Sequence, residues 1–139
     1  TSDMSYAEQR LGSDRIKGAY AWRSFIDAGV KAFPLSSDFP VEHVNPFLGF
    51  YAAVTRKWPN GDSPHGKGGW FPSQKLTREE ALSGFTIDAA YAGFSEDIVG
   101  SITKGKFADF LVLDRDIMKV PEEEIIGTTV LATIFGGRV

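Results

Sequence analysis

The chain changes its periodicity at Gly93, and this change limits the folds open to it. Before Gly93 the apolar side chains recur mostly at the spacing of helices, whereas β-branched and aromatic residues alternate after it, as they do in strands. The expected order is helix, strand, helix, helix and then several strands, which predicts an α/β chain. Its 139 residues, 42% of them hydrophobic, suffice to bury a core.

The first predicted elements are a helix over residues 13–28 and a short strand over residues 30–36. The helix places its apolar residues on one face and meets Gly29, a residue suited to the left-handed conformation that ends helices. The strand alternates, but Pro34 cannot donate a ladder hydrogen bond and should lie at its end or on an edge.

Two later helices carry strong start signals. Asn45 can cap free N–H groups, and Pro46 then occupies the first turn, where its missing donor costs nothing. Thr77 and Glu80 make a capping box for a helix over residues 77–91. The buried faces are predicted to contain Phe47, Leu48, Tyr51 and Val54 in the first of these helices, and Leu82, Phe85 and Ala89 in the second.

Three strands are predicted after Gly93, over residues 98–102, 107–114 and 128–135. A turn at Lys104-Gly105 joins the first two, and an acidic segment, "VPEEEI", precedes the last. The scattered aromatic residues are interpreted as core; these are Phe25, Phe47, Phe85 and Phe110.

Residues 58–75 form a long loop rich in glycine and proline, which favours a functional or mobile segment. Gly61, Gly66 and Lys67 match part of a phosphate-binding loop. That motif needs a Ser or Thr after the lysine, a strand before it and a helix after it, and Gly68 follows here. The sequence therefore does not predict nucleotide binding.

The bulk composition excludes several classes of partner. The net charge is -3, and no basic stripe is present to neutralise phosphates, so nucleic acid is not expected. No apolar run approaches the ~20 residues that span a bilayer, and the first residues lack a signal-peptide pattern. The chain has no cysteine, which fits a reducing compartment. A soluble, cytoplasmic protein is predicted.

Asp38 is the candidate functional residue, because it follows the predicted strand 30–36. The carboxyl ends of strands are where α/β folds assemble active sites, and a carboxylate there can bind a metal or transfer protons. An aspartate that caps its own turn is an equally weighted alternative. His43 and His65 are too few for a zinc site and are interpreted as surface residues, although His43 is close enough in sequence to pair with Asp38.

Four stretches of the chain are informative when taken together and in order: "AGVKAFPLSSDFPVEHVNPFLGFYAAVTR", "GGWFPSQKLTREEALSGFTIDAAYA", "GSITKGKFADFLVLDRD" and "VLATIFGGRV". They resemble the C-terminal part of the amidohydrolase superfamily, specifically amidohydrolase family 3. The resemblance implies that residues 1–92 are the last units of a (β/α)8 barrel and that residues 93–139 are strands of a small β-sandwich. It covers nearly the whole chain.

The resemblance also implies a role for Asp38. In the family this aspartate ends the eighth barrel strand, contacts a divalent metal, here expected to be zinc, and moves a proton from the attacking water to the leaving amine. The other metal ligands would precede residue 1. We therefore expect a part of an enzyme that hydrolyses a C–N bond of a small-molecule amide, inactive and without metal as these 139 residues alone.

Two further expectations follow from the resemblance. An incomplete barrel leaves unpaired strand edges, so the chain is predicted to associate with its own copies or to be a fragment of a longer chain. Trp58 and Trp70 in the loop 58–75 are candidate substrate contacts, with packing as the favoured role. The alternative function is a non-catalytic structural or interaction module that retains the fold residues.

Overall fold

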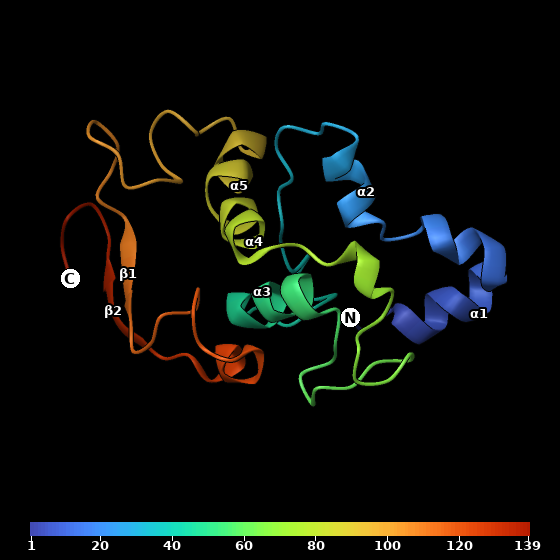
Figure 1. The fold of residues 1–139 in the computed structure, drawn as a ribbon. Helices are drawn as coiled ribbons and strands as arrows, with labels where there is room; N and C mark the ends of the chain where they lie inside the picture. The colour runs from blue at the N-terminus through green and yellow to red at the C-terminus, as the bar shows by residue number, and fades with distance from the viewer.

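A computed structural model describes residues 1–139 as helices gathered around α3, with a two-stranded ribbon at one edge (Figure 1). Helices α4 and α5 lie on one side of α3, whereas α1 and α2 lie at the end of the molecule opposite the ribbon. The helices and strands are α1 (Met4–Arg15), α2 (Trp22–Asp27), α3 (Pro46–Thr55), α4 (Arg78–Phe85), α5 (Ile87–Ala92), β1 (Phe110–Leu113) and β2 (Val130–Ile134), with 3-10 helices at Ile16–Gly18, Pro72–Gln74 and Glu122–Gly127.

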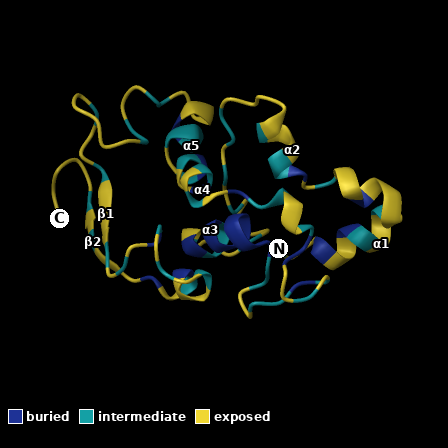
Figure 2. Ribbon diagram, in the orientation of Figure 1, coloured by how far each residue is buried: buried dark blue, intermediate teal, exposed yellow.

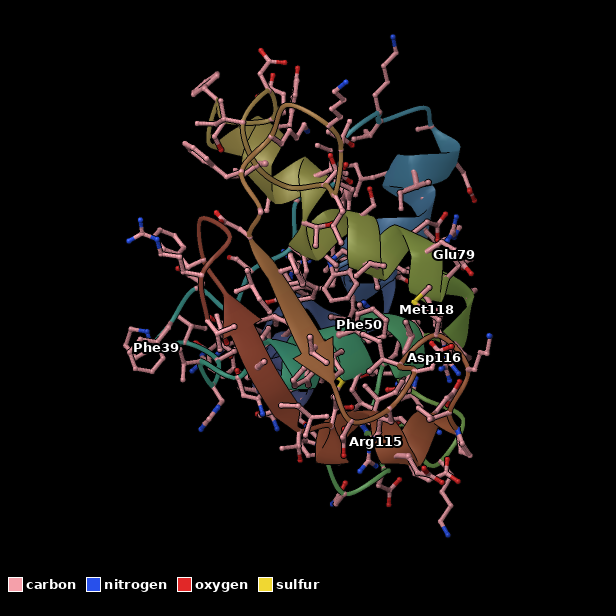
Figure 3. All side chains as sticks on the ribbon, turned by 90° about the vertical axis from the view of Figure 1, so that its left-hand side faces the viewer. Phe39, Phe50, Glu79, Arg115, Asp116 and Met118 are labelled. Carbon is pink, nitrogen blue, oxygen red and sulfur yellow. The ribbon has the colours of Figure 1, made fainter.

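Helix α3 begins as the sequence predicts and forms the centre of the core. The Asn45 side chain accepts a hydrogen bond from the Phe47 amide at 3.0 Å, and Pro46 occupies the first turn. The helix is buried over most of its surface (Figure 2). Leu48 is only half-buried, and the buried apolar residues missed by the predicted face are Phe50, Ala52 and Ala53. Figure 3 shows Phe50 inside the molecule.

The predicted helix over residues 77–91 is two helices, α4 and α5. Its capping box is confirmed, since Thr77 Oγ1 accepts from the Glu80 amide and the Glu80 carboxylate accepts from the Thr77 amide. The break falls at Thr86, whose hydroxyl donates to the Leu82 carbonyl at 2.6 Å.

The buried face predicted for this helix is wrong at Leu82. Leu82 is 40% exposed, and Phe85 and Ala89 are only half-buried. The residues that α4 and α5 bury are small, namely Ala81, Gly84 and Ala90. Small residues let these helices approach their neighbours closely, as Gly84 approaches Leu35.

The helix predicted over residues 13–28 is also wrong as a single element. The chain forms α1 and α2 with a break around Tyr20, which has a positive φ of 51°. The break frees the Tyr20 carbonyl, which accepts a hydrogen bond from Arg56 at 3.0 Å. Gly29 does end α2 with a φ of 91°, as predicted. Helix α1, kinked at Gly12, was not predicted.

No strand forms over residues 30–36 or anywhere in residues 1–92. The segment is extended and is held by a hydrogen bond from the Leu35 amide to the Gly84 carbonyl. A Cβ on Gly84 would lie 2.7 Å from Leu35 Cγ and 2.9 Å from the Phe33 carbonyl oxygen, so only glycine permits this approach. A strand needs a neighbouring strand to pair with, and none lies beside this segment.

Two of the three strands predicted after Gly93 form. Strands β1 and β2 pair antiparallel, with an irregularity between Val112 and Leu113, but residues 98–102 are not a strand. The turn at Lys104-Gly105 is confirmed, with Gly105 at a φ of 99°. The acidic segment forms a 3-10 helix whose Ile125 is buried in the core around α3.

The ribbon β1–β2 exposes apolar side chains, so the core interpretation is wrong for Phe110, which is 39% exposed, and likewise for Phe25 in α2, at 52%. Leu131 is 64% exposed. The structure therefore shows an α/β chain with a two-stranded antiparallel sheet, whereas the division into barrel units and sandwich strands stays a prediction. No helix has the length and hydrophobicity to cross a membrane.

Candidate active site

A cavity of about 360 Å³ opens between the first residues of the chain, the segment after residue 35, and α3. Most of its wall is apolar or aromatic. The polar and charged side chains that line it include Asp3, Asp38, Glu42, His43, Arg56 and Lys57. Trp58 and Trp70 from the long loop also line it, so both predicted contact residues face the same space.

Asp38 lies in an exposed turn on the cavity wall. Its backbone has a positive φ of 48°, a conformation that aspartate tolerates better than most residues. Its amide donates to the Ser36 hydroxyl at 3.3 Å, and its carbonyl accepts from the Val41 amide at 2.9 Å. The next residue, Phe39, projects away from the body of the molecule (Figure 3). The Asp38 carboxylate itself accepts no hydrogen bond and forms no ion pair within the chain.

Glu42 is the carboxylate on the wall that is hydrogen-bonded within the chain. The Glu42 carboxylate accepts hydrogen bonds from the Ser2 amide at 2.7 Å and from the Ser2 hydroxyl at 2.9 Å. Burial, followed by the nearby carboxylate of Asp3, raises the pKa of the Tyr20 hydroxyl. The Asp38 carboxylate has no partner within the chain and is therefore free to bind something else.

The histidines do not join Asp38. His43 lines the cavity, but its Nδ1 accepts from the Asn45 amide at 3.0 Å, and no hydrogen bond links it to Asp38. His65 is exposed, as predicted, yet its Nε2 lies 2.5 Å from a carboxylate oxygen of Glu8. The predicted option of an Asp38–His43 pair is therefore not realised.

Arg56 is a cavity residue that the sequence did not single out. It ends α3 in the left-handed conformation and is 3% exposed. Its Nε donates to the Trp70 carbonyl and its Nη1 to the Tyr20 carbonyl, both at 3.0 Å. The rings of Trp22 and Trp70 lie against the Arg56 guanidinium. Burial lowers the pKa of the guanidinium to about 10.

The loop 58–75 is held against α1 and the start of the chain. The Trp70 indole donates to the Glu8 carboxylate at 2.7 Å, and the Trp58 indole donates to the Thr1 carbonyl at 3.1 Å. Trp70 is buried, which confirms a packing role for it. After Lys67 the loop forms only the 3-10 turn Pro72–Gln74, so the helix that a phosphate-binding loop requires is absent.

The side chains that line this cavity do not form a complete metal site. No group of three or more histidine or acidic side chains comes together anywhere in residues 1–139. The free carboxylate of Asp38 has the chemistry of a ligand for a divalent ion. Catalytic zinc takes three protein ligands, so Asp38 would need partners from other polypeptide.

The chain belongs to the amidohydrolase family, whose model matches residues 1–139. It is 34% identical over 137 residues to Protein LONG AFTER FAR-RED 3 of Arabidopsis thaliana, covering 98% of this chain and 22% of that protein. It is 36% identical over 115 residues to the N-substituted formamide deformylase of Arthrobacter pascens, covering 83% of this chain and 20% of that protein. This chain therefore spans less than a quarter of the length of either relative.

A solved structure supports the same relationship. An uncharacterised metal-dependent hydrolase from Pyrococcus furiosus superimposes with a TM-score of 0.61 and 26% sequence identity, covering 84% of this chain and 23% of that one. The chain is thus similar to a portion of a metal-dependent hydrolase.

Proposed function

We propose that these residues are the C-terminal part of a metal-dependent amidohydrolase that cleaves a C–N bond of a small-molecule amide or N-acyl compound, and that Asp38 is its catalytic carboxylate. The observation that carries the proposal is the free Asp38 carboxylate on the wall of the cavity, in a chain of the amidohydrolase family. The N-substituted formamide deformylase among its relatives is named for an amide substrate. The proposal includes the cytoplasm as location, which the lack of cysteine favours.

The proposed chemistry of Asp38 is proton transfer. A divalent metal, proposed to be zinc, would lower the pKa of a water molecule when bound in the complete enzyme. Asp38 holds the proton that the attacking water loses and passes it to the leaving nitrogen, which departs as a neutral amine. Its exposure and lack of internal partners suit this role, because a carboxylate locked in an ion pair, as Glu80 is with Arg23, would not exchange protons near neutral pH.

The test uses the longer polypeptide that extends the reading frame before Thr1. Asp38→Asn keeps the size of the side chain and removes its capacity to accept the proton, so hydrolysis of an N-substituted formamide should fall by at least about a hundredfold. Asp62→Asn is the matched control, because Asp62 lies in the loop 58–75 and does not line the cavity. Equal activity of the Asp38→Asn variant and the parent would overturn the assignment.

A non-catalytic interaction module is the second candidate, and the exposed ribbon β1–β2 favours it. Two strands alone are marginally stable, and apolar side chains on exposed strands invite pairing with another chain. If the ribbon is the functional surface, the 139-residue chain should self-associate in sedimentation, and Leu131→Lys should return it to a monomer. A monomeric parent chain would count against this candidate.

A further inference from the structure

We propose that Arg56 is the anchor of a carboxylate-binding site in the cavity, which takes a small organic acid with an apolar or aromatic group. The proposal does not depend on the role of Asp38 or on a metal. It starts from an unusual feature, a nearly fully buried guanidinium for which the structure contains no counter-ion within 4.0 Å. Removing a charge from water without pairing it is costly, so a protein that does so has a reason to supply an anion from outside.

The hydrogen bonds of Arg56 are incomplete. Two backbone carbonyls, those of Trp70 and Tyr20, accept from Nε and Nη1, but Nη2 is buried and has no partner. The guanidinium carbon lies 4.7 Å from the ring centroid of Trp22 and 5.0 Å from that of Trp70. These rings stabilise the charge through their faces, whereas hydrogen bonds of a guanidinium lie in its own plane. The aromatic contacts therefore leave the Nη2 donors unsatisfied.

The surroundings of Arg56 select the kind of anion. A guanidinium edge matches the two oxygens of a carboxylate. The wall also contains Asp3, Asp38 and Glu42, whose negative charges favour a singly charged anion over a phosphate dianion. Because the remaining wall is mostly apolar and aromatic, the body of the ligand should be apolar as well.

Entry to Nη2 requires a movement of the wall, since this atom is closed to solvent. Tyr20 is the exposed member of the aromatic group, at 42%, and its ring lies 5.7 Å from that of Trp70. We assign the opening to this side chain. Because Trp22 and Trp70 flank the guanidinium, their fluorescence reports directly on a ligand that reaches it.

The experiment compares phenylacetate with its uncharged analogue phenylacetamide on the 139-residue chain, in metal-free chloride buffer, by tryptophan fluorescence and equilibrium dialysis. Phenylacetate should bind saturably and at least tenfold more tightly than phenylacetamide. Arg56→Met, which keeps an unbranched side chain between the indoles, should lose this discrimination. Lys57→Met removes the other cation of the wall, which pairs with Glu122 at 3.7 Å, and should keep it.

The outcomes separate this inference from the proposed function. Absence of saturable phenylacetate binding, equal affinity for both probes, or discrimination that survives in Arg56→Met would overturn it, and none of these results bears on Asp38. If Arg56→Met does not fold, Arg56→Lys retains the charge without the planar fork. Its phenylacetate affinity should then fall at least threefold, and an unchanged affinity would contradict the inference.

Discussion

Helix α3 and the ribbon β1–β2 are both apolar in sequence, yet the structure buries one and exposes the other. Seven of the ten residues of α3 are buried, whereas no residue of β1 is. The difference lies in what covers each element: α4 and the 3-10 helix Glu122–Gly127 pack on α3 within the chain, and the ribbon has no such cover (Figure 2). An apolar pattern thus predicts a need for burial, but not where the covering residues come from.

The largest loss of stability is expected from truncation of Phe50 in α3. This side chain is 3% exposed in the core around α3, so Phe50→Ala should lower the free energy of unfolding by about 3–5 kcal/mol in urea titrations. Leu131→Ala on the ribbon is the matched truncation and should change it by less than about 0.5 kcal/mol. A large loss at Leu131 would show that the ribbon is covered in solution, for example by a second copy of the chain.

The next effect concerns the approach of α4 to the extended segment before Asp38. Gly84→Ala places a methyl group against Leu35 and the Phe33 carbonyl, and it should destabilise the chain by about 1–3 kcal/mol. Gly68→Ala is the control, because a Cβ there meets nothing within 4 Å. If both variants unfold at the same urea concentration, the contact between α4 and this segment does not persist in solution.

The smallest effect is a pH dependence at the start of α4. Hydrogen bonds from Arg23, together with that from the Thr77 amide, hold the pKa of Glu80 at about 2, below its ordinary value. The stabilisation that the ionised Glu80 carboxylate gives to the folded state is therefore fully present above about pH 4.5 and is lost as the pH falls through 2. For a partly exposed pair it amounts to about 1 kcal/mol or less.

Glu80→Gln tests this dependence. The difference in unfolding free energy between the parent and this variant should be constant above pH 5, should fall steadily between pH 5 and pH 2, and should vanish below pH 2. Glu79→Gln is the control, since Glu79 is exposed on the outer face of α4 and has no charged partner (Figure 3). A difference that stays constant from pH 5 to pH 2 would contradict the assigned cause.

Local signals predicted helix starts well, and tertiary contacts decided the rest. Asn45-Pro46 and Thr77 with Glu80 act within one turn, so the sequence alone reveals them. The breaks at Thr86 and Tyr20 lie beside contacts with distant segments, which local signals do not reveal. Two residues after Thr86, the Asp88 carboxylate accepts from the Phe33 amide at 3.0 Å. At the other break, the Tyr20 carbonyl accepts from Arg56. The strand predicted over 30–36 failed for the same reason, because pairing depends on a neighbour.

The candidate site divides in the same way. Asp38 was selected because it follows the predicted strand 30–36, which does not form. The structure still puts it on the cavity wall, where its catalytic role stays a prediction. Arg56 could not be selected, because an arginine after an apolar helix is normally exposed. The sequence features most relevant to Arg56 are Trp22 and Trp70, which contact it. These contacts are visible only in the folded chain.

The central claim is that residues 1–139 supply one carboxylate, Asp38, to a metal site completed by other polypeptide. Zinc titration of the purified, metal-free chain, with metal analysis after dialysis, tests it most directly. We expect no stoichiometric zinc on the chain, and the same result for Asp38→Ala. One zinc per chain that is lost in Asp38→Ala would contradict it, because these residues would then hold the metal by themselves.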